Sequence, residues 1–283
     1  HIIGIDISKD RLDACRAADG AEAAFGNDPK GLTQLLRWLG PEPARVVFEA
    51  TGRFHLALER RLAEAGHGVI KVNPRQAKRF GEALGVRAKT DRADAAMLAR
   101  MGAALELEPG PVRPACLSDI NELTVARRAL VKERTATRNR AQGLSLPLLR
   151  RQNAARLKRI EVDLAAIDRE IAARIAAEPD LAERRAILVS IPGLSGITAA
   201  ALIAMAPELG ELDARKAGKL AGLAPITRQS GTWRGQAFIR GGRAELRHAL
   251  YMPALTAIRC NAEMTTFARR LASRGKPPKV VIT

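Results

Sequence analysis

The chain has 283 residues and a formal net charge of +17, from 47 Lys and Arg against 30 Asp and Glu. This surplus favours a polyanionic partner, most directly nucleic acid, and no apolar run approaches the about 20 residues that span a bilayer. Aromatic residues make up only 3% of the chain and its three cysteines form no CxxC pair, which disfavours base-stacking sheets, disulfide frameworks and zinc knuckles. We therefore expect a cytoplasmic protein that has no membrane partner.

Residues 1–112 predict an α/β domain. Residues 1–8 (HIIGIDIS) alternate, with Ile3, Ile5 and Ile7 on one face and Asp6 on the other. The chain begins inside this run and ends on an apolar one, so we expect further residues at both ends. Next we expect a helix at 28–40, a strand at 44–52, a helix at 55–67 that stops at Gly66, a strand at 68–74, and helices from about 74 and 91. Strands that alternate with helices indicate a sheet with helical cover.

Four acidic residues of this domain could act together. Asp6 lies in the middle of a strand, where Asp is unfavourable, and Glu49 ends the apolar strand VVFE. Asp91 and Asp94 share one face of a helix. Asp6 and the two helix acids also have ordinary explanations, because Asp6 could bond to a turn and acids early in a helix suit the macrodipole. Glu49 alone would be weak evidence. Together, four oxygen donors without His or Cys suit Mg²⁺, with Mn²⁺ as the alternative, and Lys89 and Arg92 could meet phosphates.

Residues 113–180 predict a helical coiled-coil or linker segment. The proline-rich stretch 106–118 separates it from the first domain, and its helical pattern begins at about residue 118. Leu157, Ile160, Leu164, Ile167 and Ile171 step by three and four, which suits a coiled coil or a long antiparallel hairpin, and a dimer contact. The stretch from Arg127 to Arg159 is strongly basic, with Glu133 as its one acid. This pattern favours nucleic-acid contact over a solvated helix face; the candidates are Arg127, Arg128, Lys132, Arg134 and Arg138.

Residues 181–283 predict a mainly helical domain. Residues 188–204 resemble a helix-hairpin-helix, whose turn could present N–H groups to phosphate or could simply pack. A loop rich in Gly and Arg follows at 224–243, with Arg228, Arg234 and Arg240 as further nucleic-acid candidates.

Several strings in this chain carry a family resemblance. They are GIDISKDRLDA, VVFEATG, KTDRADA, SIPGLSGITAAALIA and RQSGTWRG, in this order along the chain. With them the chain resembles the DEDD transposases of the insertion-sequence-110 family, which are related to Piv-type DNA invertases. The resemblance implies a RuvC-like branch of the RNase H fold for the first domain, a coiled-coil segment, and a C-terminal transposase domain.

The resemblance also implies roles for particular residues. Asp6, Glu49, Asp91 and Asp94 correspond to the metal-binding tetrad, and Ser230 in RQSGTWRG corresponds to a catalytic serine. Thr232 stands where the family often has a further Gly, and AFIRGG replaces its usual basic stretch. From the residues alone, Ser230 could be an ordinary loop serine; its glycine neighbour and the basic side chains around it suit a nucleophile. Ser190 and Ser195 are rivals that the hairpin already explains.

The function expected from this resemblance is RNA-guided, Mg²⁺-dependent DNA recombination through a covalent phosphoserine intermediate. Its partners would be donor and target DNA, a structured RNA encoded by the element, and further copies of the chain as a dimer or a dimer of dimers. The resemblance also implies a prokaryotic protein associated with the nucleoid. The alternative is a junction-resolving nuclease that hydrolyses DNA with water and needs the tetrad but not Ser230. A binding module without catalysis is disfavoured because all four acids are present.

Overall fold

A computed structural model of the protein describes residues 1–50, 52–85 and 90–283. The chain divides into two compact units, unit 1 at His1–Arg113 and unit 2 at Pro114–Thr283. Within the described ranges, no helix combines the length and the hydropathy that crossing a membrane requires.

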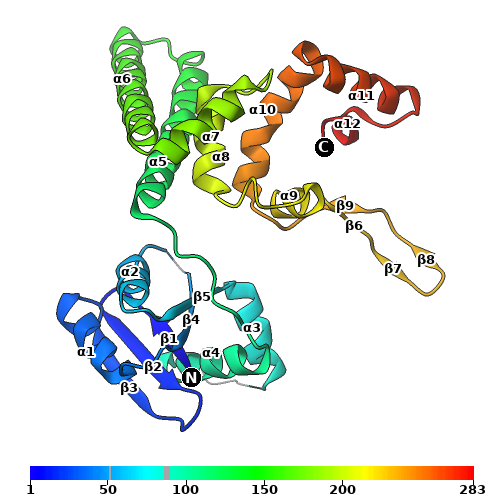
Figure 1. The fold of residues 1–283 in the computed structure, drawn as a ribbon. Coiled ribbons are helices and arrows are strands. Elements are labelled where there is room, and N and C mark those ends of the chain that lie inside the picture. Colours follow the sequence, from blue (N-terminus) through cyan, green and yellow to red (C-terminus); the bar gives the residue numbers. More distant parts are fainter. Residues whose placement is uncertain (51, 86–89) are drawn as a thin grey trace. The chain divides into compact units, whose positions relative to one another are not determined.

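Unit 1 is built on a five-stranded mixed sheet in the order β3-β2-β1-β4-β5 (Figure 1). Strands β1 (Ile2–Ile7), β2 (Arg11–Arg16) and β3 (Glu22–Gly26) are antiparallel neighbours. Strands β4 (Arg45–Glu49) and β5 (Gly68–Val72) run parallel to β1. The helices are α1 (Pro29–Leu39), α2 (Leu56–Glu64), α3 (Pro74–Ala83) and α4 (Asp91–Ala104).

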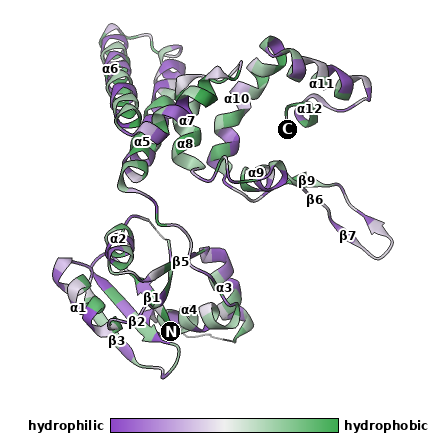
Figure 2. Ribbon diagram, viewed as in Figure 1, coloured by the Kyte–Doolittle hydropathy of each residue, from purple (hydrophilic) through white to green (hydrophobic). Residues whose placement is uncertain are grey.

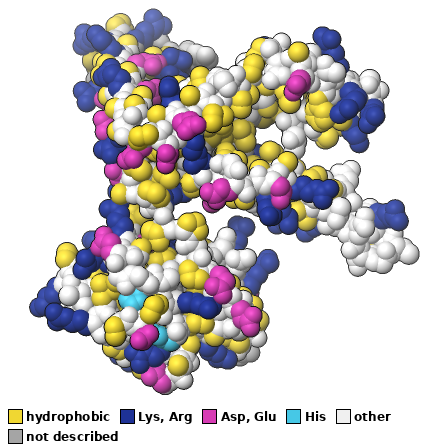
Figure 3. Space-filling model, in the orientation of Figure 1, with side chains coloured by type: hydrophobic (Ala, Val, Ile, Leu, Met, Phe, Trp, Pro, Cys, Tyr) yellow, Lys and Arg dark blue, Asp and Glu magenta, His cyan; other side chains and the backbone are white. Residues whose placement is uncertain are grey.

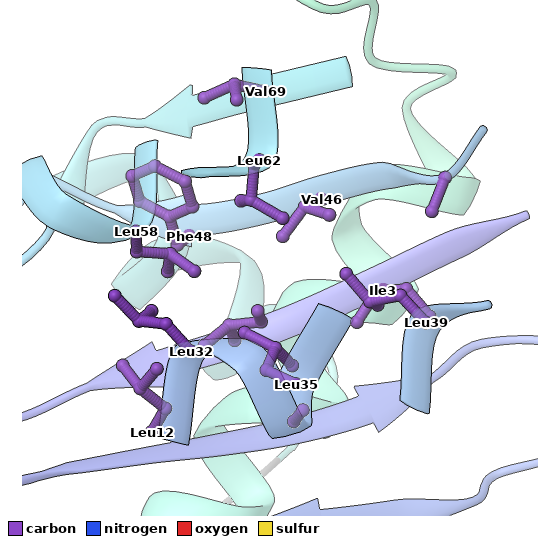
Figure 4. Close-up of a cluster of buried hydrophobic side chains, with 13 residues drawn as sticks. Ile3, Leu12, Leu32, Leu35, Leu39, Val46, Phe48, Leu58, Leu62 and Val69 are labelled. Atoms are coloured by element: carbon purple, nitrogen blue, oxygen red, sulfur yellow. The ribbon is translucent and has the colours of Figure 1, made fainter. Parts of the chain in front are cut away.

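The two faces of this sheet carry two separate apolar cores. Figure 4 shows the first, in which Ile3, Val46 and Phe48 of the sheet pack against leucines of α1 and α2. The second joins Val47 and Ile70 to side chains of α3 and α4. The alternation predicted for the first strand is therefore confirmed, with Ile3 and Ile5 in the α1–α2 core.

Helix α4 lies directly on β1 because residue 4 is glycine. A Cβ built on Gly4 would lie 2.1 Å from the carbonyl oxygen of Ala95 and 2.3 Å from the nitrogen of Ala99. Real Cβ atoms do not come so close to backbone atoms, so only glycine allows this packing. The backbone of α4 therefore fills the space above Gly4, on the face of β1 that also carries Asp6.

The predicted helices and strands of unit 1 are all present, and two strands were missed. The segment RLDACRAADGAEAAFG, rich in Ala and charge, has low β-propensity, yet it forms β2 and β3. Backbone pairing with the buried strand β1 overrides that preference. At the end of α2, Gly66 has φ +79°, as expected for a helix-terminating glycine.

Unit 2 begins with two long helices, α5 (Ala115–Ala141) and α6 (Pro147–Ala177). They form an antiparallel pair, since Arg174 bonds Asp119 near one end and Asn153 bonds the carbonyl oxygen of Thr137 near the other. Seam residues Ile160, Leu164 and Ile171 are only 3–5% exposed in the single chain. The proposed dimer contact through this seam is therefore wrong, because its core positions are already buried within one chain.

The next two helices, α7 (Pro179–Ser190) and α8 (Gly196–Met205), form the predicted hairpin. Helix α8 is apolar over most of its length and is buried (Figure 2). At the turn, a Cβ on Gly193 would lie 3.0–3.2 Å from atoms of Ala257 in α10 (Ala244–Cys260). Ser195 caps α8 by accepting the N–H of Thr198. These contacts give the hairpin a packing role, and its contact with phosphate stays a prediction.

Helix α9 (Ala214–Leu220) leads into an arm formed by the short strands β6 (Pro225–Ile226), β7 (Gln229–Ser230), β8 (Trp233–Arg234) and β9 (Phe238–Ile239). The arm projects from unit 2 in Figure 1. At its base, one guanidinium nitrogen of Arg247 donates to the carbonyl oxygens of Ala221, Gly222 and Gly241. The chain ends with α11 (Ala262–Ser273) and α12 (Pro278–Ile282).

Candidate active site

Asp6 and Glu49 lie side by side in sequence register on adjacent parallel strands. The paired residues of β1 and β4 run up to Ile5 opposite Phe48, and Asp6 and Glu49 are the next residue on each strand. Ile5 and Phe48 belong to the α1–α2 core. Side chains alternate along a strand, so Asp6 and Glu49 both belong to the opposite face, which α3 and α4 cover.

The first turn of α4 brings two more carboxylates to this face. Thr90 caps the helix by accepting the N–H of Ala93 at 3.2 Å, and Asp91 and Asp94 follow within the first turn. The helix-start explanation of these acids is therefore confirmed, and it does not exclude a second role. The packing of α4 on Gly4 places this turn near Asp6.

Burial and nearby negative charges act on the carboxyl group of Asp6. The pKa of the Asp6 carboxyl is raised from 3.8 to about 6, first by burial and then by the negative charges of Asp94 and Asp91. A hydrogen bond from the backbone at Ile7 opposes the shift. The half-buried Asp6 thus lies in an excess of negative charge, an environment that favours a bound cation.

The four predicted ligands do not form a ready-made cage. Among the residues that the structure describes, no group of three or more His, Cys, Asp or Glu side chains is close enough to hold a metal ion. Arg92 is exposed in the first turn of α4, whereas Lys89 lies outside the described residues.

Asp13 is a buried acid of this face that the sequence interpretation missed. It lies opposite Asp6 in the β1–β2 register and is 3% exposed. Its two carboxylate oxygens each accept a hydrogen bond from Arg11 at 2.7 Å, so its charge is compensated. The signal was present: a hairpin centred on the turn SKDR would have placed Asp6 and Asp13 opposite one another.

Ser230 lies at the exposed tip of the arm in unit 2. It ends β7, and Gly231 follows with φ +58°, as a tight two-residue hairpin loop requires at its first position. Arg228, Arg234 and Arg240 are exposed on the same arm. Predicted as a loop, this segment forms four short strands instead. Ser230 belongs to unit 2, whereas the four acids belong to unit 1.

The basic helix α5 has acidic partners that a local count of charges did not find. Arg127 bonds Asp168 of α6, Arg134 and Arg138 pair with Glu161 of the same helix, and Arg128 pairs with Glu245 of α10. The premise that these arginines lack acids to pair with is therefore wrong, because those acids lie far away in sequence. Lys132 is exposed on the same helix. Lys and Arg side chains gather where α5 turns into α6 (Figure 3).

Comparison with known proteins identifies the family of this chain. A family model of the DEDD, IS110 type, described as "Transposase", matches residues 3–146. A second model, described as "Transposase IS116/IS110/IS902 family", matches residues 185–269. The "Pilin gene-inverting protein" of Moraxella bovis is 30% identical, with 99% of this chain and 90% of that protein covered. Its counterpart in Moraxella lacunata is 29% identical over the same shares. The chain therefore belongs to the IS110 family of transposases.

Proposed function

We propose that this IS110-family protein is a site-specific DNA recombinase whose unit 1 supplies a metal site and whose unit 2 supplies the nucleophile. The observation that carries the proposal is the arrangement of Asp6, Glu49 and the first turn of α4, with Asp91 and Asp94, on one face of a sheet. The names of the two relatives, which refer to the inversion of a gene, support DNA rearrangement as the reaction class.

The sheet of unit 1 supports the assignment of an RNase H-like, RuvC-like domain. Its first three strands are antiparallel, and β4 and β5 add in parallel beside β1 in the order β3-β2-β1-β4-β5. We also propose that the chain has three parts: a catalytic domain at 1–112, a helical coiled-coil segment at 113–180 and a transposase domain at 181–283.

The acids fit a hard divalent cation by their chemistry. Asp6, Glu49, Asp91 and Asp94 offer oxygen donors alone, and Asp6 is half-buried among like charges. Mg²⁺, or Mn²⁺ in its place, would be held by these four residues. Such a cation, when bound, promotes ionisation of an attacking hydroxyl and stabilises the leaving oxygen of a phosphate. Asp13, already engaged by Arg11, is placed to hold β2 rather than to bind the ion.

In the proposed reaction the hydroxyl oxygen of Ser230 attacks a DNA phosphorus. The new Oγ–P bond forms as one P–O bond of the strand breaks, the serine proton leaves, and the departing strand oxygen takes up a proton to end as a hydroxyl. Attack by the hydroxyl of another strand reverses these steps and frees Ser230. One phosphodiester replaces another, so the exchange needs no nucleotide cofactor. Arg228 and Arg234 would hold the phosphate.

The proposed partners are donor DNA, target DNA and a structured RNA from the element that selects both by base pairing. The net charge of +17 supports polyanionic partners, and a chain with few aromatic residues suits delegated base reading. Exchange at two sites needs more than one active site, so we propose a homo-oligomer, as a dimer or a dimer of dimers. Light scattering with RNA bound would contradict this if it gave a monomer mass.

The test is a denaturing gel of the wild type and Ser230→Ala, run with Mg²⁺, the element's RNA and labelled donor and target DNA. We expect an adduct that resists denaturant in the wild type and is lost in Ser230→Ala. Ser190→Ala and Ser195→Ala are matched controls, since both hydroxyls already have hydrogen-bond partners within the hairpin. Both controls should keep the adduct.

The same gel decides between the two candidate mechanisms. Nicked DNA without an adduct, unchanged in Ser230→Ala, would show that water is the nucleophile and would replace this proposal with a resolvase-like nuclease. A reaction without the RNA tests separately whether RNA guides the protein to its DNA. An adduct that forms equally well without RNA would contradict such guidance.

A further inference from the structure

An exposed tryptophan lies beside Ser230. The chain contains two tryptophans. Trp38 packs in unit 1 between the ring of Phe25 and the guanidinium of Arg16, as an ordinary structural residue does. Trp233, in β8, is instead 59% exposed. Tryptophan is enriched at interfaces because its ring is apolar and its N–H is polar, and the neighbours of Trp233 give this exposure a specific meaning.

The arm holds this indole on the same face as the serine hydroxyl. Ser230 and Trp233 are partners in the antiparallel register of β7 and β8, and partners in a ladder point to the same side. Alternation puts Arg228 on this side as well, since the N–H of Gly235 donates to its carbonyl oxygen one step along the hairpin. The tip therefore presents a hydroxyl, an indole and a guanidinium together.

Gly235 fixes where the indole lies. A Cβ built on Gly235 would be 2.3 Å from Cη2 and 2.9 Å from Cζ2 of Trp233, so the ring rests over the glycine backbone. The indole is thus supported from the hairpin side, and more than half of its surface stays open.

The charge around Trp233 indicates its partner. Residues 224–243 contain four arginines and no acidic residue. Arg243 is engaged by Glu208 at the base of the arm, whereas Arg228, Arg234 and Arg240 are exposed. A flat aromatic surface among exposed arginines matches a nucleobase that follows a phosphate, because bases stack on aromatic side chains while arginine binds the backbone.

We propose that Trp233 stacks on a nucleobase next to the phosphate that Ser230 engages, and so positions that phosphate for attack. The proposal rests on the proposed role of Ser230, but the stacking itself does not depend on chemistry. Stacking tolerates any base, so this contact would hold the strand at the cleavage point and leave the choice of sequence to other contacts.

The first test measures stacking without reaction. Ser230→Ala and the double variant Ser230→Ala/Trp233→Phe are titrated with single-stranded oligothymidylate and with the element's donor duplex, and tryptophan emission is recorded. We expect quenching in the first protein and little in the second, which retains only Trp38. Equal quenching in both would overturn the proposal. Quenching that depends on protein concentration without DNA would also overturn it, by showing that Trp233 contacts a second copy of the chain.

The second test asks whether an aromatic ring, rather than apolar bulk, is needed. Trp233→Leu should weaken binding of the oligothymidylate about ten- to a hundredfold, whereas Trp233→Phe should stay within a few-fold of the wild type. Gly235→Ala, which displaces the indole and leaves its chemistry unchanged, should give an intermediate loss. Equal affinities for the Leu and Phe variants would overturn the proposal. Phe238→Leu, an exposed aromatic residue elsewhere on the arm, is the matched control and should bind normally.

Adduct formation then separates the two proposals. If the wild type forms no Ser230 adduct but Trp233 is still quenched by DNA, the proposed nucleophile fails and stacking stands. Suppose instead that the wild type forms the adduct. If Trp233→Leu then forms it at the wild-type rate with saturating DNA, and reaches half of that rate at the same DNA concentration as the wild type, the positioning role of Trp233 fails. We expect Trp233→Leu to lower the rate at saturation, with recovery in Trp233→Phe.

Discussion

The acidic face of unit 1 and the arm of unit 2 are built in opposite ways. Asp6 and Glu49 each follow a wholly buried residue, Ile5 and Phe48, and α4 packs directly onto β1 at Gly4. Ser230 belongs to a two-residue strand with exposed side chains, and the side chains of Arg243 and Arg247 bond backbone carbonyl oxygens at the base of the arm. One region is positioned by a core, the other by its few backbone hydrogen bonds.

This difference suits the division of work that we propose for the two regions. A metal site needs its ligands held in a fixed geometry, which buried strands and a packed helix provide. A nucleophile that must reach a phosphate within a large nucleic-acid assembly is better carried on a projecting element. Substitutions in unit 1 should therefore affect stability and chemistry together, whereas those on the arm should affect function alone.

The largest effect is expected from removing a single charge on the acidic face. Asp6→Asn should lower strand cleavage about a thousandfold, as loss of a metal ligand does, as measured on the denaturing gel. In Mg²⁺-free buffer it should unfold at higher denaturant than the wild type, because one of several like charges is gone. Asp10→Asn, an exposed acid in the adjoining turn, is the control and should cleave normally. Equal losses in the two variants would contradict a specific role for Asp6.

The packing of α4 is tested by adding one methyl group. Gly4→Ala places a Cβ against backbone atoms of Ala95 and Ala99, and we expect a loss of about 3 kcal/mol in the free energy of unfolding. Urea denaturation followed by circular dichroism measures it. In Gly81→Ala the nearest atom to the new Cβ is Cγ of Met97, at 3.7 Å, so this variant should be as stable as the wild type or slightly more so. A neutral Gly4→Ala would refute the close packing.

Two cations of α5 separate a structural role from a binding role. Arg127 donates from Nε to Asp168 at 2.5 Å in a partly buried site, so Arg127→Ala should cost about 1–2 kcal/mol of stability. Lys132→Ala, on the exposed side, should leave stability within about 0.5 kcal/mol. It should instead lower the salt dependence of DNA binding by about one unit. The reverse pattern would mean that the ion pair is dispensable and Arg127 is the nucleic-acid contact.

The smallest expected effect is on the pH dependence of stability. Burial lowers the pKa of His55 and of His67, whose Nδ1 accepts the N–H of Ala44 at 3.2 Å. The unfolded chain then binds protons more readily, so this stability is complete above the ordinary pKa of 6.5 and is lost as pH falls from there through the lowered folded values. Denaturant midpoints between pH 7.5 and 5.5 measure the loss.

Asp6 acts in the opposite direction and must be removed from this measurement. Its raised pKa lets the folded state take up a proton as pH falls through about 6, which stabilises that state relative to the unfolded chain. The measurement is therefore made in Asp6→Asn. Adding His67→Asn should flatten the remaining slope, and an unchanged slope would show that His67 does not contribute.

Local sequence patterns were sufficient to predict much of the structure of unit 1. The alternation of Ile3 and Ile5 against Asp6, and of Val46 and Phe48 against Glu49, assigns each acid to the face opposite the α1–α2 core. The apolar spacing of α1, the terminating glycine of α2 and the acids at the start of α4 were also legible, because each depends on periodicity or on a residue's own backbone preference.

The predictions that failed were those that depended on partners distant in sequence. Strands β2 and β3 have poor intrinsic propensity and exist because β1 offers backbone groups to pair with. The arginines of α5 seemed free of acids because Asp168, Glu161 and Glu245 come 23 to 117 residues away in sequence. The seam of α6 suggested a dimer, but α5 of the same chain covers it.

The sequence by itself determined the family and the face to which each strand acid belongs, since motifs and alternation are written locally. It also named the four acids and the serine as candidates for the proposed site. Only the tertiary structure decided that Gly4 admits the helix that brings Asp91 and Asp94 towards Asp6. It alone decided that Asp13 is neutralised by Arg11 and that Trp233 stands open beside Ser230. Those outcomes depend on close approach between segments, which steric fit and charge compensation settle only once the chain has folded.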